Sequence, residues 1–156
     1  MPPSETARIS GHLTLELRDG AGALLERRSV PNLITDAGKV LLARLLGGKN
    51  QGAVTLAIAV GESQAAPVRG NTALGKQLVE VPAEMGDPGV FDVGVRVTVR
   101  ATIPPGGDPQ IVLPLTEAGV VVHVGDQELA LFNRVTFPVI NKGASMSLLL
   151  SWDLTF

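Results

Sequence analysis

The clearest signal in the chain is an alternation of apolar and polar residues in three stretches. Residues 9–18, 91–103 and 146–156 place an apolar side chain at nearly every second position. A period of two is typical of a strand with one buried and one solvated face. We therefore predict three such strands. One wall of the core is predicted to consist of Phe91, Val93, Val95, Val97 and Val99.

Shorter apolar runs separated by turn residues predict the remaining strands. They cover residues 23–30, 53–60, 78–81, 111–115, 120–124 and 129–140. Runs rich in Gly, Pro, Asp and Asn are typical of turns. The predicted turns are 19–22, 83–89, 104–109, 117–119 and 125–127, and residues 61–77 are predicted to form a long loop that crosses the end of the sheets.

One segment has helical rather than strand periodicity. Thr35 suits a helix N-cap, Asp36 places an acid in the first turn, and an apolar stripe follows up to Leu46. The pair Gly47-Gly48 is a typical end signal for a helix. The pattern predicts one short α-helix over about residues 36–46.

Together these elements predict a mostly β protein, an antiparallel β-sandwich or jelly-roll-like fold with one short helix. The chain of 156 residues is long enough for one domain, which we place at residues 9–156. Residues 1–8 are polar and contain two prolines. We interpret them as an N-terminal arm that orders against a partner.

Composition removes several classes of function. The net charge is −2 and no lysine-rich run exists, so we expect no nucleic-acid partner. There is no Cys, which excludes thiolate catalysis and thiolate metal sites. No apolar run reaches 18 residues and the N-terminus lacks a signal-peptide pattern, so we expect a soluble protein made in the cytoplasm, without a membrane partner.

Residues 70–77 match most of a P-loop, the phosphate-binding loop of nucleotide-binding proteins. Gly70, Gly75 and Lys76 stand at the required positions, but Gln77 replaces the Ser or Thr that would hold magnesium. The segment before Gly70 is not an apolar strand. We predict a surface loop rather than a nucleotide site.

Other candidate chemistry is sparse. His12 falls on the polar face of the first strand, and His123 lies in an apolar run; a third soft ligand for zinc is missing. Carboxylates in or beside turns could serve a glycosidase or bind calcium, but such residues commonly hydrogen-bond the backbone. These carboxylates are Asp87, Asp92, Asp108, Asp126 and Glu128. We predict no catalytic residue, no cofactor and no metal site.

Arg96 and Arg100 are the candidate interface residues. They share the polar face of the predicted strand 91–103, with Thr98 between them. In a monomer both would be solvated, whereas in an assembly each could pair with a carboxylate of a neighbour.

Six segments, taken together, resemble a loose family of tailed-phage virion proteins found in tail-fibre, baseplate and particle-decoration genes. The family pattern includes N-L-[IV]-T-x-A-G before a helix, T-E-A-G, F-x-R-x-x-F-x-x-I-x-K and a terminal W-x-[ILV]-x-F. Val120-Val121 departs from it, since the family more often has Leu-Phe there. The matching segments are NLITDAGK (32–39), IAVGES (58–63), NTALG (71–75), LTEAGV (115–120), LFNRVTFPVINK (131–142) and LSWDLTF (150–156).

The resemblance implies a virion protein without enzymatic activity, either a capsid decoration (cement) subunit or a tail-attachment subunit. High mean hydropathy, +0.28, and a terminal strand that would leave an edge independently favour assembly. We expect a homo-oligomer, a trimer before a dimer, that binds other virion proteins. Two alternatives remain open. A module that binds a host-surface glycan or protein should expose Trp in a groove, whereas Trp152 is predicted to be buried; a wall-degrading hydrolase should bring acids and His together.

Overall fold

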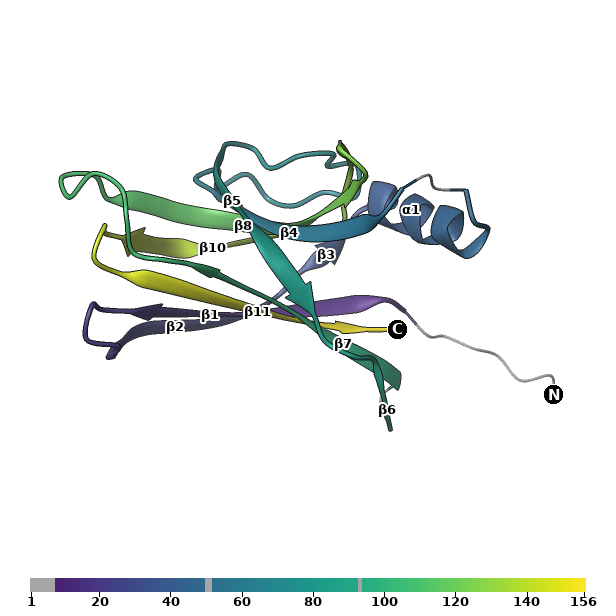
Figure 1. The fold of residues 1–156 in the computed structure, drawn as a ribbon, viewed down its shortest axis with the longest axis horizontal. Helices are drawn as coiled ribbons and strands as arrows, with labels where there is room; N and C mark the ends of the chain where they lie inside the picture. Colours follow the sequence, from purple (N-terminus) through teal and green to yellow (C-terminus); the bar gives the residue numbers. More distant parts are fainter. Residues whose placement is uncertain (1–7, 50–51, 93) are drawn as a thin grey trace.

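Two layers of antiparallel strands make up most of the chain in the computed structural model, which describes residues 8–49, 52–92 and 94–156 (Figure 1). Strands account for 57% of the residues, and one short helix lies among those described. The predicted fold, mostly antiparallel, β-sandwich-like and with one short helix, is confirmed. The predicted arm lies outside the described residues, except for Arg8.

The first layer contains the strands with the clearest alternation. Its order is β2, β1, β11, β7, and β6 adds to the outer part of β7. The bounds are β1 Ser10–Arg18, β2 Leu24–Pro31, β6 Gly89–Phe91, β7 Gly94–Ile103 and β11 Ser147–Thr155.

The second layer follows the order β5, β4, β8, β10, β3, with β9 paired to β8. Glu84 and Met85, at the end of β5, pair with β7, so this strand joins the layers and the sheet is nearly closed. The bounds are β3 Leu33–Ile34, β4 Val54–Gly61, β5 Gln77–Met85, β8 Leu113–Val124, β9 Gln127–Leu131 and β10 Asn133–Lys142.

The main core lies between the layers and is built from alternate residues of each strand. On β1 the inward side chains are Leu13, Leu15 and Leu17, and on β11 Trp152 is fully buried, as predicted. The indole nitrogen Nε1 of Trp152 donates to Asn32 Oδ1 at 2.6 Å, so the polar atom of the largest core side chain is satisfied.

The helix α1, Asp36–Leu46, lies at one end of the sandwich, and its predicted bounds are confirmed (Figure 1). Thr35 is the N-cap, and its hydroxyl oxygen accepts from the amide of Gly38 at 2.9 Å. Leu41 faces the core, whereas Leu46 is exposed. No helix in the described part of the chain has the length and apolarity needed to cross a membrane.

The structure corrects several predicted boundaries in the second half of the chain. Residues 117–119 are not a turn but the middle of the continuous strand β8. Residues 129–140 are not one strand, because Phe132 separates β9 from β10. The strand predicted at 78–81 extends to Met85, so residues 83–85 of the turn predicted at 83–89 are strand, whereas residues 86–88 connect β5 to β6.

The structure confirms Val97 and Val99 of the predicted core wall and contradicts the prediction for Phe91 and Val95. Val97 and Val99 are buried on β7. Phe91 belongs to β6, on the other side of a tight hairpin, and is exposed; Val95 is also more than a third exposed. Both lie where the two layers no longer face each other, so the alternation continues beyond the closed core. Val93 lies outside the described residues.

Candidate functional site

A buried ion pair lies on the outer face of the second layer, beneath the loop of residues 62–76. Arg134 Nε on β10 lies 3.1 Å from Glu117 Oε1 on β8, and the two side chains are 2% and 0% exposed. The register pairs Glu117 with Thr136, so Glu117 and Arg134 project from the same face of neighbouring strands. The side chains from Ala118 and Val135 project into the main core instead.

Backbone amides complete the surroundings of the Glu117 carboxylate. Ser63 N donates to Oε2 at 2.8 Å, Gly75 N donates to Oε1 at 2.7 Å, and Lys76 N donates to Oε2 at 2.8 Å. With Arg134, four donors reach one carboxylate. A buried charge is tolerated when it is paired and hydrogen-bonded in this way.

These contacts shift the titration of Glu117. Burial by itself raises the pKa of a carboxyl group, but the amides of Lys76, Gly75 and Ser63 and the Arg134 guanidinium favour the charged form. The net result is a pKa for Glu117 below the ordinary value of 4.5. The carboxylate is therefore ionised and already saturated with internal donors.

The ion pair fastens the 62–76 loop to the sheet. Asn71 Oδ1 in that loop accepts from Arg134 Nη1 at 3.2 Å. Leu74, from the same loop, packs in a small second core with Ala57, Ala59, Val121 and Leu131. Gly61 is required at the start of the loop, because a Cβ there would lie 2.8 Å from Glu117 Oε2 and closer still to the carbonyl of Lys76.

The P-loop-like segment belongs to this cluster. The amides of Gly75 and Lys76 could otherwise cradle a phosphate, but both donate to Glu117. The Lys76 ammonium pairs with Glu62. Because the donors are occupied within the chain, the arrangement favours the predicted surface loop over a nucleotide site.

The two histidines and the turn acids are dispersed. His12 contacts Ser29 Oγ at 2.5 Å, and His123 Nε2 lies 3.2 Å from Glu80 Oε2. Asp108 accepts from the amide of Gln110, a typical turn contact. Within the described residues, no group of three His, Cys, Asp or Glu is placed to hold a metal. The side chain of Glu128 lies outside the described part.

Arg96 and Arg100, the candidate interface residues, are both exposed on β7. The Arg96 guanidinium carbon lies 5.3 Å from the centre of the Phe91 ring, a cation–π contact. Arg100 is opposite Glu84 and Ser151 in the sheet register. Their role at an interface stays a prediction.

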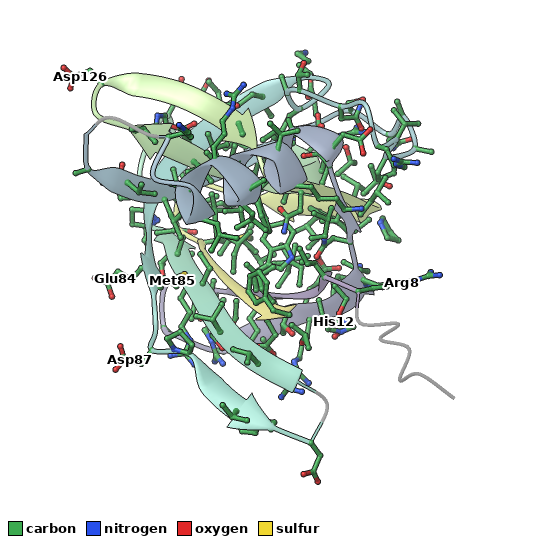
Figure 2. The ribbon with its side chains drawn as sticks, turned by 90° about the vertical axis from the view of Figure 1, so that its right-hand side faces the viewer. Arg8, His12, Glu84, Met85, Asp87 and Asp126 are labelled. Carbon is green, nitrogen blue, oxygen red and sulfur yellow. The ribbon has the colours of Figure 1, made fainter. Side chains whose placement is uncertain are left out.

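An open apolar cavity of about 560 Å³ lies at the end of the sandwich that carries α1. Figure 2 looks toward this end, with Met85 and Asp87 at one side of it. Thr55 is the one polar side chain of the lining. The rest are apolar and come from α1 (Leu41, Leu42, Leu45), β4 (Val54, Leu56), β5 and its exit (Ala83, Met85, Pro88), β7 (Val95, Val97), β8 (Val120, Val122), and Phe132, Leu154 and Phe156.

Sequence reasoning missed both the ion pair and the cavity. A signal for the ion pair is present: Glu117 is the one charged residue in the segment 111–122, and Arg134 is the one charged residue in the segment 129–141. Charged residues at such positions are seldom fully buried unless they are paired. The cavity has no local signal, since its lining alternates as any core does.

Comparison of the chain with protein-family models, with curated proteins and with solved structures found no match.

Proposed function

We propose that the protein is a non-enzymatic structural subunit on the outside of a tailed-phage particle, where it assembles with copies of itself and with capsid or tail proteins. The resemblance of six segments to phage virion proteins motivates the proposal. Its main structural support is the open apolar end, a surface suited to association and poorly suited to acid–base chemistry.

Several residues in the segments that resemble phage virion proteins make buried contacts that hold the fold together. Glu117 of the T-E-A-G segment and Arg134 of the next segment form the buried ion pair, and Asn71 contacts Arg134. Asn32 accepts from Trp152, which joins the first and last segments. Side chains this enclosed cannot reach a substrate, so these patterns make sense as requirements of folding rather than of catalysis.

The environment of Trp152 disfavours the alternative of a glycan-binding module. Its ring lies in the core, is 0% exposed, and its indole nitrogen is bonded to Asn32. The chain has no Tyr that could replace it as a stacking platform. An adaptor or decoration subunit that binds through an apolar face does not need such a platform.

Immunogold electron microscopy of purified particles tests the proposal. Antibody raised against the protein should label intact particles of the phage that encodes it, and antibody against a cytoplasmic host enzyme should not. Label on the head would indicate a decoration role and label on the tail an attachment role. Unlabelled particles that also lack peptides of this chain would contradict the proposal.

A further inference from the structure

The inner faces of the two layers continue past the closed core at the end that carries α1. Val54 continues the inward positions of β4, and Val95 continues those of β7. Phe156 does the same for β11. All three are more than a third exposed, although their strands alternate as if each were buried. This end of the core therefore lacks a cover within the described chain.

The opening arises where β5 changes partner. This strand pairs with β4 from Gln77 to Ala83, and then Glu84 and Met85 pair with β7. Since β4 extends to Val54 without β5 beside it, the two strands separate. Side chains from both strands line the cavity that results.

A projecting apolar element lies beside the cavity. The β6–β7 hairpin extends beyond the layers (Figure 1), and Val90 on β6 is 86% exposed. Val90 pairs with Val95, which lines the cavity, so both point to the same side of the hairpin. Phe91 points to the other side, beneath the guanidinium of Arg96.

The exposed apolar area approaches the size that a stable interface needs. At on the order of 100 Å² for each side chain, the six exposed residues at this end supply roughly 600 Å². A standard interface buries about 800 Å² on each partner, whereas a monomer rarely exposes more than a few hundred in one patch. These residues are Leu46, Val54, Met85, Val90, Val95 and Phe156.

Charges around the cavity differ in net sign between its two sides. The side formed by β5 and the β6–β7 hairpin exposes three acids, Glu84, Asp87 and Asp92, against one base, Arg96, whose guanidinium lies over the Phe91 ring; Figure 2 shows Glu84 and Asp87 on the same side of this end. The side formed by α1 exposes Arg44 and, just after the helix, Lys49. A second copy that brings its hairpin to this cavity would place its acids near these bases, which favours association of the chain with itself.

We propose that a second copy of this chain covers the open end, with the β6–β7 hairpin of one copy seated in the apolar cavity of the next. Val90 is the central contact, and the acidic side of one copy faces the basic side of its neighbour. Two copies can exchange hairpins reciprocally, and three can do so around a closed ring. This inference deepens the proposed function by naming the surface through which the chain self-associates.

Sedimentation equilibrium of Val90→Asp tests the contact. Because Val90 is exposed in the single chain, the variant should keep the circular dichroism spectrum of the wild type. The wild type should sediment as an oligomer, and Val90→Asp should associate at least tenfold more weakly. The matched control is Val112→Asp, an exposed valine in the segment before β8, at the opposite end of the sandwich, and it should leave the oligomer intact.

Engineered cysteines give a second test, because the chain has none of its own. Val90→Cys protein mixed with Val54→Cys protein should form a disulfide between copies under mild oxidation. Ile111→Cys replaces Val90→Cys in the control mixture and should not crosslink, since Ile111 is exposed in the same distant segment as Val112.

The outcomes separate this inference from the proposed function. A wild type that stays monomeric at high concentration, or an oligomer that Val90→Asp leaves unchanged, overturns the hairpin contact; gold labelling of particles still decides the virion role. If Val90→Asp stays oligomeric but no longer labels particles, the open end binds another virion protein and the second-copy proposal is wrong. Loss of the oligomer in a normally folded Val90→Asp variant, together with formation of the Val90→Cys/Val54→Cys disulfide between copies, supports it.

Discussion

Removal of one charge from the Glu117–Arg134 pair should destabilise the fold strongly. Glu117→Gln keeps the shape of the side chain but leaves the Arg134 guanidinium buried without an acid. The glutamine amide also turns a donor toward the amides of Ser63, Gly75 and Lys76, so at least one of these loses its acceptor. Breaking a buried ion pair costs about 3–5 kcal/mol, a large share of the roughly 5–15 kcal/mol of a typical domain.

Urea denaturation followed by tryptophan fluorescence measures this loss, because Trp152 is the single tryptophan and is buried. With an m-value of about 2 kcal/mol/M, the midpoint should fall by roughly 1.5–2.5 M. Glu26→Gln is the matched control. Glu26 pairs with Arg28 on the partly exposed surface of β2, and such pairs contribute only about 0.2–1 kcal/mol.

The pH dependence has a definite sign. The pKa of Glu117 is lowered by folding, so its contribution is present above the unfolded value of about 4.5 and is lost as the pH falls through the lower folded value. Wild-type stability should therefore fall more steeply than that of Glu117→Gln below about pH 4.5. The double variant Glu117→Gln/Arg134→Met should lose less than the sum of the two single variants. A Glu117→Gln midpoint as close to wild type as the Glu26→Gln midpoint would refute the account of the ion pair.

Three further substitutions test other parts of the account. Val97→Asp places an unpaired carboxylate in the core and should abolish soluble folding, whereas Val112→Asp on the surface should not, as fractionation and circular dichroism will show. Lys76→Ala should leave the melting temperature nearly unchanged, and calorimetry should detect no ATP binding to the wild type; ATP affinity that this variant loses would contradict the assignment of the loop. Thr35→Ala removes the cap of α1 and should cost about 1–2 kcal/mol in urea, and a neutral result would reject the capping role.

Strands with one face on the core were predictable from alternation alone. In β1 and β11 every inward position is apolar and every outward position is solvated or half-buried. The period of two in the sequence is therefore sufficient to predict both strands and their buried faces. The helix was equally clear, because Thr35 and the Gly pair after Leu46 mark both its ends. Each of these elements is specified by its own local sequence and packs one apolar face against the core.

The turn predicted at residues 117–119 is wrong because the contacts that stabilise this part of β8 come from distant parts of the sequence. Glu-Ala-Gly has the composition of a turn, and a carboxylate in the middle of a buried strand is unfavourable unless donors reach it. Here the donors come from Ser63, Gly75, Lys76 and Arg134, which are far away in the sequence. No pattern within β8 could report those contacts.

The prediction that the core wall extends to Val95 is wrong for a different reason. Val95 follows the alternation of Val97 and Val99, but burial depends on whether an opposite layer covers the position. The departure of β5 from β4 removes that cover near Val54. Alternation predicts which face of a strand is apolar and cannot predict where the facing sheet stops.

Quantitative mass spectrometry of gradient-purified phage particles tests the central claim most directly. The account predicts that peptides of this chain copurify with the major capsid or tail protein at a fixed molar ratio through successive gradients and salt washes. Abundant chain in the infected-cell lysate, with none retained in the infectious particle band, would contradict it.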